Sequence, residues 1–302
     1  ERYIPVTINN NAPFADLNRY HFIGALTGGT ASKWVGQFNF GIQGAITNYS
    51  TTVTPMSGCL RTFLDGASAY SALLAYDESK VNGDCDLAGW LPLTGTAATP
   101  RGKGFTARIN DASVINPQRI LSESGSYANT AISLNGLSIT AANNTDDPGG
   151  VYGGAYNTKG GHIVSNPFWA PIDWSTVASV NGGNNLDASM YLYDPAQGIF
   201  IPVNNLSAPS ERIVATNAAF TVRPLDPNQS SFAINFPVNA RVSSANNEFL
   251  EEKPLDEYTM KITVSSANQE SDYTRLVFNN QFSASYDNGY DAVKLFSSAG
   301  VP

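Results

Sequence analysis

The side chains with the clearest chemical potential are oxygen donors in one turn-rich loop. Residues 77–86 read Asp-Glu-Ser-Lys-Val-Asn-Gly-Asp-Cys-Asp. Hard cations prefer several oxygen ligands, which a loop dense in aspartate and asparagine supplies. The sequence therefore predicts a structural Ca²⁺ site here, and the alternative is a solvated turn without an ion. The candidate ligands are Asp77, Asn82, Asp84 and Asp86. Asp226 with Asn228 and Asp287 with Asp291 are further options.

Paired carboxylates also hydrolyse glycosidic bonds, one as an acid and the other as a base or nucleophile. Asp77, Glu78, Asp173 and Asp194 are the candidates for such a pair. Asp77 and Asp194 each follow a tyrosine at the end of an apolar segment, where aspartate is ordinary turn chemistry. We therefore expect a protein that is not an enzyme, with glycan hydrolase as the third candidate function.

Nucleophilic and transition-metal chemistry have little support in the sequence. His21 and His162 lie in apolar segments, which predicts structural strand residues rather than catalytic bases. Neither a Gly-x-Ser-x-Gly nor a His-Glu-x-x-His pattern occurs. Cys59 and Cys85 have no neighbouring histidine. Two cysteines in a chain of low charge suggest one disulfide in an oxidising compartment, and the alternative is two buried thiols.

The tryptophans offer a possible platform on which sugar rings stack. Aromatic side chains more often pack in a core, so the two interpretations stay open. Trp169 follows Phe168 and precedes Ala170-Pro171 in a predicted loop, and it is the tryptophan most expected at the surface. Trp169 and Trp34 are the candidate ligand-binding residues. A non-catalytic carbohydrate-binding module is accordingly the second candidate function.

Composition and charge restrict the class of partner. The 302 residues include 42% hydrophobic and only 14% charged residues, and the net charge is −8. An acidic chain repels phosphate backbones, so we expect no nucleic-acid partner. Apolar runs stay well short of the roughly 18 residues of a membrane helix, so we expect no membrane insertion. The polar share is carried by Asn, Ser, Thr and Gly, as in secreted β proteins.

Short alternating segments separated by turn residues predict an all-β fold of two sandwich or jelly-roll units. One short helix is expected from Trp174 to Val180, where Asp173 is placed to cap the first turn. The most turn-rich stretch, residues 143–150, predicts a boundary between a first unit, residues 1–155, and a second unit, residues 156–302. The clearest expected strands are residues 1–8, 21–26, 90–93, 102–109, 131–141, 191–193, 199–203, 219–223, 231–236, 258–264 and 274–278.

The two halves repeat a set of motifs in the same order, which suggests an internal duplication. The gaps between the motifs differ, so chance similarity is the alternative. A duplication predicts two similar units packed side by side. The corresponding segments are 21–23 with 162–164, Trp34 with Trp174, 76–77 with 193–194, 90–93 with 200–203 and 104–108 with 219–223.

Several segments together resemble a known family. Residues 165–174 read Ser-Asn-Pro-Phe-Trp-Ala-Pro-Ile-Asp-Trp, similar to an NPYPSxIDW pattern, and depart from it at Trp169-Ala170. Residues 89–92, 102–105, 217–222 and 287–295 are similar to GW-P, GxGF, QAFFV and D-GYDAxKL patterns. These patterns are those of Bacteroidetes cell-surface and secreted proteins, among them adhesins and gliding-associated proteins, exported by the type IX secretion system.

The resemblance implies export and display at the cell surface, and it implies no activity. We expect an extracellular structural or adhesive module, such as a subunit of a surface fibre or array. Its partners would be other copies of itself, other surface proteins or glycans. Since such proteins usually continue into a sorting domain, we also expect the chain to belong to a longer polypeptide.

Overall fold

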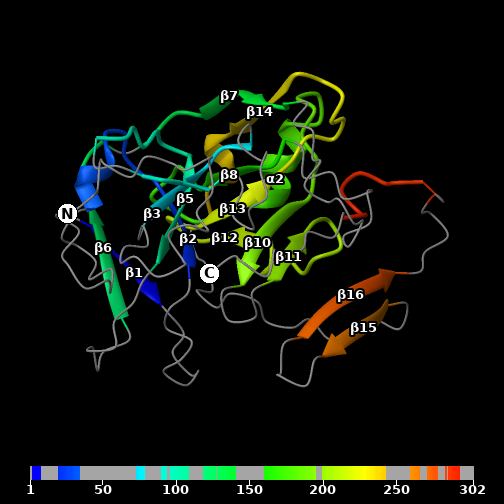
Figure 1. Cartoon of the computed structure of the whole chain (residues 1–302). Helices are drawn as coiled ribbons and strands as arrows, with labels where there is room; N and C mark the ends of the chain where they lie inside the picture. Colours follow the sequence, from blue (N-terminus) through cyan, green and yellow to red (C-terminus); the bar gives the residue numbers. More distant parts are fainter. Residues whose placement is uncertain are drawn as a thin grey trace, which may run out of the picture.

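The protein is all-β, as the sequence predicts. The computed structural model describes residues 2–7, 20–34, 73–78, 90–93, 96–108, 118–126, 128–140, 160–194, 199–242, 259–265, 271–277, 283 and 285–292. Within these residues the strands form antiparallel sheets, and the chain forms one α-helix (Figure 1).

The first four-stranded sheet has the order β2-β5-β3-β4. Its strands are β2 (Tyr20–Gly24), β5 (Gly104–Arg108), β3 (Leu73–Tyr76) and β4 (Trp90–Pro92). A separate pair joins β1 (Arg2–Thr7) to β6 (Gln118–Glu123), of which β6 was not expected from the sequence. Trp34, at the end of the 3-10 helix η2 (Ala31–Trp34), is buried with Ile23, Leu73 and Phe105 in the core of this half.

The second four-stranded sheet has the order β8-β13-β10-β11. Its strands are β8 (His162–Ser165), β13 (Ala219–Val222), β10 (Met190–Asp194) and β11 (Ile199–Val203). Two further pairs join β7 (Ile132–Ser138) to β14 (Ser231–Phe236) and β9 (Ile172–Asp173) to β12 (Ile213–Val214). The core of this half includes Trp174, Phe220, Phe232 and Phe236.

The predicted helix is confirmed as α2 (Trp174–Val180). Its N-cap is Asp173, whose Oδ1 accepts a hydrogen bond of 2.9 Å from the Ser175 backbone N–H. That bond satisfies one of the amides that a helix leaves unpaired in its first turn. Trp174 and Val177 are the buried residues of the helix, and the 3-10 helix η5 (Val238–Ala240) packs against it.

The two sheets agree in strand register as well as in strand order. Phe105 of β5 lies opposite Ile23 of β2, and Phe220 of β13 lies opposite Val164 of β8. The tryptophan beside each phenylalanine packs in a similar way. The rings of Trp34 and Phe105 are 5.5 Å apart at 69°, and those of Trp174 and Phe220 are 5.4 Å apart at 74°. The segments that correspond in sequence therefore occupy corresponding places in the two sheets.

The two sheets meet through reciprocal contacts between β2 and β5 on one side and β8 and β13 on the other. The Gly24 N–H donates to Asn217 O at 2.8 Å, and the Ser165 N–H donates to Gly102 O at 2.7 Å. In the matching registers Gly24 corresponds to Ser165. A Cβ on Gly24 would collide with the Cβ of Ser165, so this close approach requires a glycine. We call this set of contacts the junction.

The predicted division between residues 155 and 156 lies outside the described residues. Strand β7, which the prediction assigns to the first unit, pairs with β14 of the second. Ile139, just after β7, belongs to the core cluster of the second half. Two later elements complete the fold. They are a hairpin of β15 (Thr259–Ser265) and β16 (Ser271–Val277), and a segment at residues 285–292, which we call the closing segment.

Candidate functional site

The predicted calcium and disulfide residues fall largely beyond what the structure describes. Asn82, Asp84, Asp86, Cys59 and Cys85 lie outside the described residues. Asp77 is half-buried immediately after β3. Among the described residues, no group of three or more His, Cys, Asp or Glu side chains is placed to hold a metal ion. The other aspartates considered as Ca²⁺ ligands, Asp226, Asp287 and Asp291, accept hydrogen bonds from residues two to four positions away.

Two of the carboxylates considered for hydrolysis hold backbone segments in place. Glu78 is buried, and its carboxylate accepts hydrogen bonds from the Thr140 backbone N–H at 3.2 Å and the Thr140 hydroxyl at 2.7 Å. It thereby ties the end of β3 to the chain just after β7. Asp173 caps helix α2.

His162 packs inside the second half. Its Nε2 lies 2.8 Å from Ser138 O, and its ring meets Phe232 edge-on at 5.6 Å between centroids. Burial lowers the pKa of the imidazole below its ordinary value, and the hydrogen bond to Ser138 partly opposes that effect. This setting suits the predicted structural role. His21 occupies the corresponding register position in β2 and is half-buried.

The tryptophans considered for sugar stacking are not placed alike. Trp34 is 0% exposed, so neither face of its indole is accessible to a sugar ring. Trp174 is also buried, and its Nε1–H donates to Ala188 O at 2.7 Å. Trp169 is half-buried in the loop after β8. The structure therefore leaves Trp169 as the better placed of the two candidate ligand residues.

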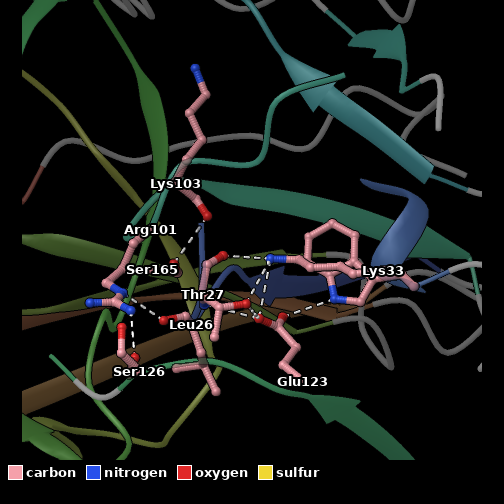
Figure 2. A network of polar contacts seen from close by, with 9 residues as sticks. Leu26, Thr27, Lys33, Arg101, Lys103, Glu123, Ser126 and Ser165 are labelled. Carbon is pink, nitrogen blue, oxygen red and sulfur yellow. Dashed lines mark hydrogen bonds and ion pairs between the residues drawn. The ribbon is translucent and has the colours of Figure 1, made fainter. Parts of the chain in front are cut away.

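A buried polar network surrounds Glu123 at the end of β6 (Figure 2). Glu123 is 3% exposed. Its Oε2 accepts hydrogen bonds from the Thr27 N–H at 3.0 Å and the Thr27 hydroxyl at 2.8 Å, and its Oε1 accepts one from the Trp34 indole at 2.9 Å. The Lys33 ammonium completes the set at 3.2 Å from Oε2. We call this arrangement the Glu123 network.

The chemistry available to Lys33 is limited by these contacts. Its Nζ donates to Thr27 O at 2.6 Å and lies 4.7 Å from the centroid of the Trp34 ring. Burial lowers the pKa of the Lys33 amine, and the neighbouring Glu123 carboxylate opposes that shift. Both carboxylate oxygens of Glu123 are used as acceptors. The network therefore acts as a clamp that fixes residues 27–34 onto β6.

The sequence correspondence does not extend to this network. Glu123 lies opposite the first residue of β1, and Phe236 lies opposite the first residue of β7. Phe236 is fully buried in the core of the second half. The β1–β6 pair therefore ends in a buried carboxylate, whereas the β7–β14 pair ends in a buried aromatic ring.

The closing segment is bound to two loops at the ends of β10 and β11. Asn204 Nδ2 donates to Tyr290 O at 2.8 Å, and the Ala188 N–H donates to Asn288 Oδ1 at 2.8 Å. The Tyr286 hydroxyl donates to Asp187 Oδ2 at 2.8 Å. Burial raises the pKa of Asp187, and its hydrogen bonds to Ser189 and Tyr286 oppose that rise. These contacts attach residues 286–291 firmly to the second half.

The β15–β16 hairpin, which we call the arm, carries exposed apolar side chains. Its strands pair along seven residues each, and among the described residues neither joins another sheet. Figure 1 shows it apart from the two sheets. Met260, Ile262 and Leu276 are 45%, 43% and 40% exposed. Met260 lies directly opposite Leu276 in the register, so the arm presents an apolar patch.

Sequence reasoning found neither the Glu123 network nor the apolar patch on the arm. Lys33 and Glu123 are far apart in the chain, and alternation within residues 258–264 indicates a strand without showing which side stays uncovered. Comparisons with protein-family models, curated proteins and solved structures found no match to this chain. In the described part of the chain, no helix has the length and apolar character needed to cross a membrane.

Proposed function

We propose that this protein is an extracellular structural and adhesive module of a bacterial surface protein, which contacts its neighbours through the arm. The observation that carries the proposal is the exposed patch of Met260, Ile262 and Leu276 on a two-stranded hairpin. Unpaired strand edges are sites at which sheets add a strand from another chain. Natural proteins usually cover or charge such edges, so this exposed apolar arm favours a role in contact.

The arrangement of the two sheets supports a structural role. Matching strand order, matching registers and the two tryptophan–phenylalanine pairs favour an internal duplication over chance similarity. On this interpretation β1 to β6 form one unit and β7 to β14 form the other. Each has a four-stranded sheet and a longer two-stranded pair, and the second unit has the short β9–β12 pair in addition. The division then falls between Glu123 and Ile132 rather than at residue 155.

Export and surface display rest on the resemblance to Bacteroidetes surface proteins, together with the low content of charged residues. A structural module of this kind needs contacts that resist local opening. The Glu123 network, the Glu78–Thr140 contact and the bound closing segment are three such contacts within the described residues. A Cys59–Cys85 disulfide and a Ca²⁺ ion at residues 77–86 stay predictions of the same proposal.

The proposal is tested on cells that display the protein. The double variant M260S/I262S should still be exported but should lose most of its adhesion to surfaces or neighbouring cells. The matched control is Leu225→Ser, which alters another exposed apolar side chain away from the arm. Exposed substitutions seldom change stability by more than about 0.5 kcal/mol, so both variants should melt like the parent. Unchanged adhesion of the double variant would contradict the proposal.

Glycan binding is a second candidate, which one cluster of aromatic side chains favours. Phe22 stacks on Tyr193 at 5.0 Å and 20°, and Phe200 lies 5.2 Å from Tyr193. All three are half-buried, and they bring β2 together with β10 and β11. The partly exposed outer surface of such a cluster is apolar and can stack against a sugar ring. Calorimetry with surface polysaccharides should then show binding that Tyr193→Ala abolishes and Val180→Ala preserves.

A further inference from the structure

The arm has a strand edge that can pair with its own counterpart in another molecule. An isolated two-stranded hairpin is at best marginally stable in water, whereas three or more strands with an apolar face are stable. The arm has two strands, and among the described residues no third strand joins them. Additional strands are thus the most direct way to stabilise it. The question is which chain supplies them.

The distribution of charge favours contact between the arms of two copies over contact between the rest of each molecule, which we call the body. Residues 259–277 carry Lys261, Arg275, Glu270 and Asp272, a net charge of zero, although the whole chain carries −8. The rest of the molecule therefore carries the entire −8. Two bodies of that charge repel when close, but charges separated by more than about 8 Å are largely screened at physiological ionic strength. Contact between two arms keeps the bodies apart.

The sequence of β15 is complementary to itself. An antiparallel pair of β15 strands centred on Ile262 places that residue opposite its own counterpart and Met260 opposite Val264 of the other copy. Lys261 then lies opposite Thr263, so no charge faces a like charge or an apolar residue. An antiparallel pair of two β16 strands centred on Thr274 instead places Asp272 opposite Leu276 of the other copy. Of these two arrangements, the β15 pair is the better match.

We infer that a second copy of this chain binds to the β15 edge, so that two arms form a four-stranded antiparallel sheet about a two-fold axis at Ile262. Residues directly opposite each other in antiparallel strands share a face of the sheet. The two apolar patches thus merge into one. This inference rests on the proposed function, because it names the partner that the arm would bind.

The size of the contact indicates how strong it should be. Stable protein pairs bury about 800 Å² on each partner, more than one strand edge supplies. The paired arms should therefore form a weak, concentration-dependent dimer, suited to an array of molecules held at one surface, where local concentration is high. A tight dimer in dilute solution is not expected.

The oligomeric state of the purified chain tests the inference. Sedimentation velocity should show a dimer that increases with concentration. Ile262→Lys places two cations opposite each other on the axis and should raise the dissociation constant at least about tenfold, which corresponds to about 1.4 kcal/mol. Leu225→Lys should leave it unchanged. A monomer at every soluble concentration, or equal weakening by both variants, would overturn the inference.

A crosslink tests the position of the axis. Opposite residues in antiparallel strands have Cα atoms about 4.5–5.5 Å apart, which suits a disulfide. Ile262→Cys should give a covalent dimer under mild oxidation. Thr274→Cys, an exposed position on β16, should not. A covalent dimer through Thr274→Cys alone would show that β16 is the paired edge and refute the inference.

The inference and the proposed function can fail separately. If the purified protein is monomeric but Ile262→Lys still abolishes adhesion of displaying cells, the arm binds some other surface component and only the inference fails. If the purified protein dimerises through β15 but Ile262→Lys leaves adhesion unchanged, the proposed function fails and the dimer stands.

Discussion

The indole N–H of Trp34 donates a hydrogen bond of 2.9 Å to Glu123, a residue 89 positions later in the chain. This bond joins the 3-10 helix η2 to the end of β6, and the Lys33 ammonium reinforces it. In the second half the equivalent indole, on Trp174, donates to a backbone carbonyl instead. The same packing of tryptophan on phenylalanine thus has two different polar attachments.

Removing the Glu123 carboxylate should destabilise the first half strongly. Glu123→Ala leaves the Lys33 charge and the Trp34 indole without their acceptor, and breaking a buried ion pair from one side costs about 3–5 kcal/mol. Urea unfolding of the purified chain measures the loss. The double variant K33M/E123L removes both charges and should recover much of the stability, since paired apolar replacements are often neutral. A single variant with unchanged stability would show that the clamp is not needed.

The junction predicts a rescue between two distant positions. Gly24→Ala forces a Cβ against the Ser165 side chain, and overpacking of this kind costs about 1–3 kcal/mol. Adding Ser165→Gly removes the obstructing Cβ and should restore part of the loss, despite the lost hydrogen bond from Ser165 Oγ to Lys103 O. Gly28→Ala is the matched control, because nothing lies within 4 Å of a Cβ there. Additive losses in the double variant would argue against direct contact.

His162 should make stability depend on pH on the acid side of neutrality. Burial lowers its pKa in the folded protein below the ordinary value of 6.5, with Lys103 lowering it further and Asp77 and Glu78 opposing the shift. The unfolded chain therefore binds more protons between the two pKa values, and the free energy of unfolding should fall as pH drops below 6.5. The loss levels off below the folded pKa.

His162→Gln tests this directly, because glutamine keeps a donor for Ser138 O but does not titrate. In the variant, the free energy of unfolding measured with urea between pH 5 and 8 should no longer contain the pH-dependent part that His162 contributes. The difference between parent and variant should be constant well above pH 6.5 and change below it. A difference that is constant across the whole pH range would exclude a lowered pKa for His162.

Tyr286 should control how firmly the closing segment is held. Its hydroxyl donates to the buried Asp187 carboxylate, so Tyr286→Phe removes a hydrogen bond to a charged group. The expected cost is about 1.5–3 kcal/mol. Hydrogen exchange should speed up at residues 286–291 and at the Asn205 amide, which donates to Gly289 O. Leu225→Ala, a truncation of an exposed side chain outside the closing segment, is the control. Uniform acceleration across the chain would instead indicate global destabilisation.

Local patterns predicted the elements of this fold well. Alternation at 219–223 and 231–236 anticipates β13 and β14, and Asp173 before Trp174 anticipates the cap of α2. These features depend on residues close together in sequence. Strand β6 was missed, and β7 was assigned to the half with which it does not pair. Strand pairing depends on contacts between distant segments, which periodicity does not report.

The candidate site was harder to predict for the same reason. The sequence correspondence of Trp34 with Trp174 pointed to a shared packing role, and the full burial of both side chains fits that reading better than a sugar platform does. The Glu123 network brings Thr27, Lys33 and Trp34 to a carboxylate from another strand. Residue type alone indicates neither that partner nor the exposure of the arm.

The way the arm is attached determines how the molecule would carry mechanical load. The described residues on either side of the arm are bound to the second half: the Val242 N–H donates to Pro171 O at 2.9 Å, and Asn204 Nδ2 donates to Tyr290 O of the closing segment. A neighbour that pulls on the arm therefore applies force to the second half at Val242 and at the closing segment. Within the described residues, it reaches the first half through the junction, where backbone hydrogen bonds such as Ser165 to Gly102 would resist separation, and through the Glu78–Thr140 contact. Under tension, the arm and its attachments at Val242 and at the closing segment should therefore break before the Glu123 network bears load.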